Sequence, residues 1–148
     1  MTTLKTSQRY PLPDPLEAGL AELKAYWDGI QRGFRIMPYW DDVDMTRLGA
    51  LRRQVVLLDA PQAPDRFRFN LVGEAVAEAY GQELEDRFVD EIAPAAPLHE
   101  LTEQCQATAA ESAPTYFRHR EAGYARLLLP LWGNGRVEML IGCISETG

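Results

Sequence analysis

The chain has 148 residues, of which 46% are hydrophobic and 25% are charged, and its formal net charge is −7. This balance fits one folded domain of ordinary size and argues against a disordered chain. The negative charge also argues against nucleic acid as a partner, because most of the surface would repel a phosphate backbone.

The first ten residues are polar and lack the apolar core of a signal peptide. No uninterrupted apolar stretch has the length that a membrane span requires. We therefore expect a cytoplasmic location without membrane contact. The two cysteines, Cys105 and Cys143, have neither disulfide-framework nor metal-site spacing and are interpreted as buried, small apolar residues.

The N-terminal part predicts an extended arm followed by a helix. Residues 1–13 are polar and end in Pro11-Leu12-Pro13, so the arm is expected there and a single domain over residues 14–148. Asp14 is a suitable N-cap, and Pro15 suits the first helical position. Regular spacing then marks a narrow apolar stripe, formed by Leu16, Leu20, Leu23, Trp27 and Ile30. This stripe either packs on its own domain or forms a seam between two copies.

The rest of the chain alternates between short helical and extended patterns. A short helix capped by Asp44 is expected to run to Arg53. Further helical segments are predicted at residues 74–80, 84–92 and 98–112. Strands are predicted at residues 55–59, 66–72, 115–120, 124–132 and 136–145. Pro130, within the fourth of these strands, predicts a bulge or an edge position.

The order of these elements favours an α+β fold. Short turns between neighbouring strands imply antiparallel pairing, and the helical stretch between the second and third strands must cross one face of the sheet. We therefore predict a five-stranded antiparallel sheet with helices on one face and an extra N-terminal helix.

Several local motifs stand in a definite order along the chain. They are Trp27, Arg35-Ile36-Met37-Pro38 followed by Asp42-Val43-Asp44, Phe69-Asn70-Leu71-Val72-Gly73, a helix closing at Gly81, and Tyr124-Ala125-Arg126-Leu127-Leu128-Leu129-Pro130-Leu131. Together they resemble a bacterial family of stand-alone PAS-type domains of this size. The resemblance covers nearly the whole chain and implies a PAS-like fold with a sensory or regulatory role, but no particular ligand. Tyr39-Trp40 and Glu74 depart from the family's pattern and leave the role of the Met37-Pro38 connector open.

A candidate ligand cavity follows from the face of the sheet that the crossover helices would cover. The side chains expected to point into it are Phe67, Phe69, Leu71, Tyr80, Phe88, Leu101, Leu127, Leu129, Met139 and Ile141. An apolar cavity lined in this way can hold a small molecule. Packed solidly, the same side chains are simply a core.

The sequence does not assign a cofactor. Haem-binding PAS domains take an iron ligand from a helix in the region of His99, but one histidine near a helix start is usually a surface residue. The cysteine-containing flavin motif of light-sensing relatives is absent, and Cys105 lies outside such a context. Neither haem nor flavin is therefore expected.

Strand arginines predict a second kind of surface. Most of them alternate with the apolar positions and would make the outer face of the sheet basic: Arg66, Arg68, Arg118, Arg120, Arg126 and Arg136. A solvated face is one interpretation. The other is a docking surface, in which Arg118 and Arg126 meet an acidic partner such as the first helix of a second copy and so form a homodimer.

The candidate catalytic groups do not form a recognisable set. His119 and Cys143 have no third group or oxyanion hole, and Asp41, Asp42 and Asp44 lack the ligand pattern of a calcium loop. No enzyme and no metal site are therefore expected. The leading hypothesis is a stand-alone PAS-like sensory or regulatory domain that binds an unidentified small molecule, a protein partner or both. A ligand-free interaction or localisation adaptor is the alternative, and a small cavity enzyme is the least favoured.

Overall fold

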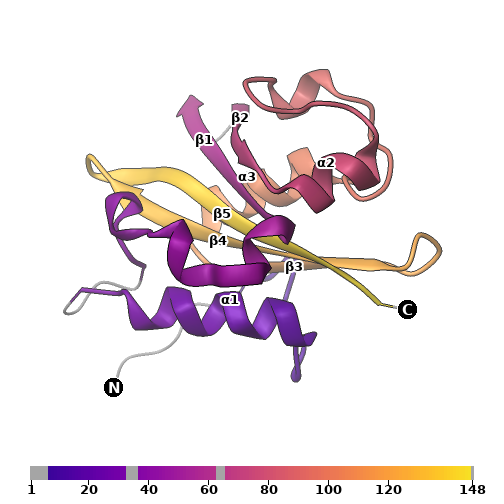
Figure 1. Ribbon diagram of the computed structural model, residues 1–148. Helices are drawn as coiled ribbons and strands as arrows, with labels where there is room; N and C mark the ends of the chain where they lie inside the picture. Colours follow the sequence, from indigo (N-terminus) through magenta and orange to yellow (C-terminus); the bar gives the residue numbers. More distant parts are fainter. Residues whose placement is uncertain (1–6, 33–36, 63–65, 148) are drawn as a thin grey trace.

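The structure, a computed structural model, describes residues 7–32, 37–62 and 66–147. At its centre lies one antiparallel sheet of five strands in the order β2-β1-β5-β4-β3 (Figure 1). The strands are β1 (Val55–Gln62), β2 (Arg66–Val72), β3 (Thr115–His119), β4 (Tyr124–Gly133) and β5 (Arg136–Glu146). The predicted five-stranded antiparallel α+β fold is confirmed.

Helices cover both sides of the sheet (Figure 1). Helix α1 (Ala18–Gly29) packs on β4 and β5 from one side, whereas α2 (Glu74–Tyr80) and α3 (Leu101–Glu111) lie on the other. Three 3-10 segments connect the larger elements: η1 (Trp40–Asp42), η2 (Met45–Gln54) and η3 (Val89–Glu91). Within the described part of the chain, every helix is too short or too polar to cross a lipid bilayer.

Helix α1 begins later than the capping signals predict. Asp14 and Pro15 lie before the helix, and the N-cap position is taken by Glu17, whose side chain makes no capping bond. Leu20 and Leu23 are 0% exposed, and the Trp27 indole Nε1 donates a 2.9 Å hydrogen bond to the Pro130 carbonyl.

The apolar stripe of α1 is therefore used inside its own domain. Its inner members are covered by β4 and β5, and Leu16 and Ile30 at its two ends are partly buried. The expectation that this stripe forms the seam of a homodimer is wrong for the inner positions, since a second copy could reach them only by displacing the sheet.

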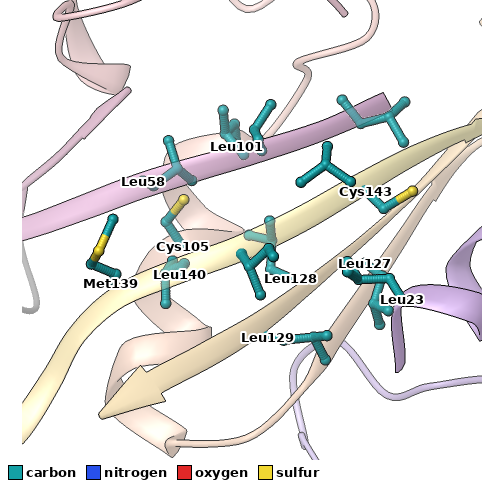
Figure 2. Packing of buried hydrophobic residues seen from close by; sticks show 14 of the residues in the cluster. Leu23, Leu58, Leu101, Cys105, Leu127, Leu128, Leu129, Met139, Leu140 and Cys143 are labelled. Atoms are coloured by element: carbon teal, nitrogen blue, oxygen red, sulfur yellow. The ribbon is translucent and has the colours of Figure 1, made fainter. Parts of the chain in front are cut away.

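The sheet register shows which strand side chains meet α1. Residues paired directly across an antiparallel ladder share a face. Leu127 pairs with Cys143 and Leu129 with Ile141, so these four side chains lie on one face, opposite to that of Arg126. Arg126 bonds α3, and this face therefore meets α1. Figure 2 shows part of the resulting core, including Leu23 of α1 with Leu127 and Leu129.

The second half of the core lies between the sheet and the crossover. Phe69 pairs with Leu58 of β1, which in turn pairs with Leu140 of β5. All three are buried on the face toward α3, where Leu101 and Cys105 are also buried (Figure 2). This layer is the region in which the sequence predicted a cavity.

A bulge in β2 corrects the predicted alternation of that strand. Between Leu57 and Leu58 of β1 the partner shifts from Leu71 to Phe69, so Asn70 is the extra residue. Because of this insertion, Leu71 shares a face with Leu57 and Ile141, on the α1 side, instead of following Phe69. Period-two reasoning from sequence cannot detect such a shift.

Pro130 lies in a part of β4 that has no neighbouring strand on its outer side. Strand β3 is paired with β4 only as far as Leu128, so at Pro130 the only neighbouring strand is β5. A bulge follows between Leu131 and Trp132. The predicted bulge or edge position is confirmed, because a residue without an N–H is tolerated where no neighbour needs one.

Other boundaries differ modestly from the predictions. Asp44 caps η2 by accepting a hydrogen bond from the Thr46 N–H, as expected. The segment predicted as helix at residues 84–92 is largely irregular and contains only η3, and α3 is shorter than residues 98–112. Arg35 and Ile36 of the connector motif lie outside the described residues, as do residues 1–6 of the arm.

The described part of the arm is tied to the domain. The hydroxyl of Ser7 and the N–H of Gln8 donate to the Glu111 carboxylate, at 2.5 and 3.0 Å. The Tyr116 N–H of edge strand β3 donates to the Tyr10 carbonyl at 3.0 Å. The arm therefore contacts the end of α3 and the open edge of β3.

Gly73, between β2 and α2, provides a test of this architecture. A Cβ atom built there would overlap the backbone carbonyl groups of Arg52 and Arg53 at the end of η2. We expect Gly73→Ala to lower the free energy of unfolding by at least about 2 kcal/mol, because backbone must move to make room. Chemical denaturation measures the change. Gly29→Ala is the control, since nothing lies within 4 Å of its Cβ position, and equal stability of the two variants would contradict the packing.

Candidate functional site

The most unusual side chain of the domain is Arg126, near the start of β4. It is 0% exposed, although arginine is almost never fully buried without a charged partner. Among the described residues it forms no ion pair. Its guanidinium donates instead to three neutral oxygens: Gln104 Oε1 at 2.7 Å, Pro97 O at 3.0 Å and His99 O at 2.7 Å.

Burial explains the electrostatics of this group. Removal from water lowers the pKa of Arg126, because no carboxylate offsets the cost of its charge. The Phe117 ring lies under the guanidinium, 4.8 Å from its central carbon, and supplies a cation–π contact. Arg126 therefore fastens three parts of the fold to one another: β4, the 97–99 loop and α3.

A buried polar chain continues from Arg126 into α3 and β3. The Gln104 amide nitrogen donates to Thr115 Oγ1 at 3.0 Å, and the Thr108 and Thr115 hydroxyl groups lie 2.7 Å apart. The Thr108 hydroxyl also bonds the Gln104 carbonyl. Every side chain in this chain of contacts is 0% exposed and satisfied, which fixes the position of α3 on the sheet.

Tyr124 carries the network toward the surface. It is 3% exposed, and its hydroxyl accepts the His99 backbone N–H at 3.0 Å and lies 2.9 Å from His99 Nδ1. The His99 and His119 rings are stacked with centroids 4.1 Å apart. His119 Nδ1 accepts the Ala122 N–H at 3.0 Å. Burial, the charge of His119 and that of Arg126 all lower the pKa of His99.

A groove of about 700 Å³ opens beside Tyr124, between α2, the start of β4 and the end of β5. We call it the α2 groove. Its lining residues are Gln54, Ala75, Val76, Ala79, Ala96, Pro97, Ala122, Gly123, Tyr124, Ile144, Ser145 and Glu146. This volume is in the range of small-molecule sites, and the walls combine apolar side chains with polar groups.

The groove exists because small residues line its walls. Ala75 and Ala79 are one helical turn apart on α2 and present the same face. Tyr124 pairs with Glu146 and so shares its face, and the buried Ile144 lies two residues from Glu146. Alanines on the helix above this floor leave space that leucines would fill.

The α2 groove and the buried network have two residues in common. Tyr124 lines the groove and holds His99 through its hydroxyl. Pro97 also lines the groove, and its carbonyl accepts from Arg126. A change of either residue at the groove therefore affects the hydrogen bonds through which Arg126 and Tyr124 hold the 97–99 loop and α3, which we call the Arg126 anchor.

A family model described as a PAS domain matches residues 17–145. The chain belongs to the PAS domain family. No curated protein and no solved structure matches it. PAS domains are generally sensory and not catalytic. Membership therefore supports a sensory or regulatory domain in general.

The PAS domain does not gather the ten predicted cavity residues into one site. Phe67, Phe69 and Leu101 lie on the crossover side as expected, whereas Leu71, Leu127, Leu129, Met139 and Ile141 lie on the α1 face. The sheet separates the two groups. Tyr80 and Phe88 are partly buried; the Tyr80 hydroxyl bonds the Ala93 carbonyl, and Arg66 covers the Phe88 ring. None of the ten lines the α2 groove.

The predicted basic face is wrong at its centre. Arg126 points toward α3 and is buried, so it cannot form a docking surface with the exposed Arg118. Arg66 and Arg68 are neutralised locally, through ion pairs with Asp90 at 3.0 Å and Asp59 at 2.7 Å. Alternation places Arg126 on the α3 face, together with Leu128, while Leu127 and Leu129 turn to α1.

The remaining candidates occupy structural positions. Asp42 pairs with Arg32, and Asp44 caps η2. Burial raises the pKa of the Cys105 and Cys143 thiols to about 12, so neither forms a thiolate near neutral pH. His99 contributes to the polar network and not to an apolar cavity.

Sequence reasoning missed the residues that build the groove. Ala75, Ala79, Ala96 and Ala122 carry no chemical signature, and only their placement in space leaves a hollow. One feature of the sequence could have indicated that Arg126 is buried. It directly precedes the run Leu127-Leu128-Leu129, and a strand with such a run is apolar on both faces. That pattern predicts a central strand with an internal arginine.

Replacing Arg126 tests the anchor. We expect Arg126→Met to lower the free energy of unfolding by at least about 2 kcal/mol, because three buried oxygens lose their donor. Arg118→Met, on the exposed end of β3, is expected to change it by less than about 0.5 kcal/mol. Urea denaturation of both variants gives the comparison. An Arg126→Met domain as stable as the wild type would show that the guanidinium does not hold the crossover.

The lowered pKa of His99 predicts a loss of stability in mild acid. The unfolded chain binds a proton at His99 near pH 6.5 while the folded domain resists it, so stability present above about pH 6.5 declines as the pH falls below that value. Charged groups facing the ring are His119, Arg126 and Glu100, of which only Glu100 favours protonation.

Thermal denaturation between about pH 7.5 and about pH 5.5 measures this decline. His99→Gln keeps an acceptor for the Tyr124 hydroxyl and cannot titrate, so it is expected to flatten the profile in this range. Carboxyl groups with lowered pKa, such as Asp42, Asp90 and Glu111, add their own losses only in stronger acid. An unchanged slope in His99→Gln would refute the assignment.

Proposed function

We propose that this PAS domain is a sensor that binds a small molecule in the α2 groove and signals by contact with a partner protein. The observation that carries the proposal is the sharing of Tyr124 and Pro97 between the groove and the Arg126 anchor. A ligand that touches these two residues necessarily touches the contacts that hold the start of α3.

The route from groove to surface supports this proposal. Tyr124 holds His99, and His99 stacks on His119 at the end of β3. Arg126 and Gln104 connect the same point to α3 and to Thr115 at the start of β3. Strand β3 is an edge strand of the sheet, and the arm lies on it and on the end of α3, so a shift of either element changes a surface that a partner can contact. A ligand acts in this way by favouring one of two packings.

The adaptor hypothesis remains the alternative function, in which the domain binds a protein without any ligand. The one large apolar side chain that is strongly exposed among the described residues is Trp40, at 44%. It covers Gly133 at the end of β4, far along that strand from Tyr124. A partner seated there would not need the groove, and this distinguishes the two functions.

Native mass spectrometry of freshly purified protein tests the sensor proposal. We expect a small molecule to be retained by the wild type and lost from Ala79→Leu, whose larger side chain fills the groove. Ala110→Leu, at an exposed alanine of α3, is the control and is expected to retain it. A wild-type domain that carries no molecule, and that captures one protein equally well with and without Ala79→Leu, would contradict sensing and favour the adaptor.

A second variant tests the route of the signal. Tyr124→Phe keeps the ring in the groove and removes the hydroxyl that holds His99. The retained molecule is expected to stay bound, while hydrogen exchange at the first turn of α3 no longer depends on whether it is present. Unchanged coupling in this variant would show that the signal leaves the groove by another route.

A further inference from the structure

The charge of the α2 groove indicates what kind of molecule it accepts. Of its twelve lining residues only Glu146 is formally charged, and among the described residues this carboxylate forms no ion pair or hydrogen bond. Of the other polar side chains, the Tyr124 hydroxyl is already engaged by His99, the Ser145 side chain leaves the opposite face of β5, and the Gln54 amide oxygen lies beside Gly19 of α1. The groove therefore offers a negative charge and no positive one.

Glu146 and Tyr124 are direct partners across the β4–β5 ladder, so their side chains leave the same face of the sheet, toward α2. The Tyr124 ring is 3% exposed and stacked on the His99 and His119 rings, whereas Glu146 is exposed. The group of the groove that is open to a ligand's charge is therefore the Glu146 carboxylate, which suits an organic cation.

The walls add an apolar requirement. Ala75, Ala79, Ile144 and Pro97 offer hydrocarbon surface and no hydrogen-bonding side chain. Groups that surround the groove add little positive charge, since Arg53 pairs with Glu74 at 2.9 Å and Arg126 is enclosed behind Pro97 and Tyr124. A molecule that satisfies both features has a cationic head and an apolar body.

We propose that the α2 groove binds a small amine with an apolar body, its ammonium group on Glu146. This inference rests on the proposed sensor function and specifies the ligand class. It gives separate roles to the two ends of the site: Glu146 selects the charge, and the space left by Ala75 and Ala79 selects the body.

A trio of probes with one body and three head groups tests the inference: phenylbutylamine, phenylbutanol and phenylbutyrate. Isothermal titration calorimetry at low ionic strength is expected to rank the amine first and the carboxylate last. An ion pair at a partly exposed site contributes at most about 1 kcal/mol, so the amine should bind about fivefold more tightly than the alcohol. The preference should shrink as salt is added, because the charge is not fully buried.

Two variants separate the roles. Glu146→Gln is expected to remove the preference for the amine while leaving the alcohol's affinity unchanged, and Glu83→Gln, at an exposed acid outside the groove, is its control. Ala79→Leu is expected to weaken binding of all three probes, and Ala110→Leu of none. Thermal denaturation confirms that each variant is folded.

The outcomes distinguish the inference from the sensor function on which it rests. Equal affinity for the three probes, or a preference for the amine that survives Glu146→Gln, would overturn the assignment of a cation site and leave a groove that binds by its apolar walls. Failure of every probe to bind would also overturn it. If, in addition, native mass spectrometry finds no retained molecule, the sensor function fails as well.

Discussion

Arg126 is a cation that the fold removes from water without giving it an anion. A buried guanidinium persists in such a place only when its hydrogen-bonding positions are filled, and here the oxygens that fill them come from a loop and a helix distant in sequence. The arrangement of the crossover over the sheet depends on this contact. If the Pro97 and His99 carbonyls moved away, the charge would be left unsatisfied.

Because the crossover is held by these few hydrogen bonds, a change in any one of them affects how α3 packs on the sheet. The polar chain through Gln104, Thr108 and Thr115 is buried and finds its hydrogen-bond partners among its own members. A perturbation at Tyr124 or Pro97 meets hydrogen bonds that connect to this network, because Tyr124 bonds His99 and the Pro97 carbonyl accepts from Arg126.

The α2 groove lies beside this network for a topological reason. The end of η2 abuts Gly73 at the start of α2, so the helix is held at that end of the sheet. Its alanines then face the β4–β5 ladder across a gap that their short side chains do not close. The fold thus places an open space against the least adaptable contacts of the domain, while the face that packs on α1 is filled by Leu20, Leu23 and Trp27.

The sequence by itself determined the elements and the family. Alternation, turn residues and the helical stripe are local patterns, and they predicted all five strands, their antiparallel pairing and the position of α2. Only the tertiary structure decided which face each strand residue occupies. The bulge at Asn70 reverses Leu71, and β4 is covered on both sides, so Arg126 is inside while Leu127 and Leu129 meet α1. The groove is also a tertiary feature, because an absence of side-chain volume between segments distant in sequence leaves no mark on any one of them.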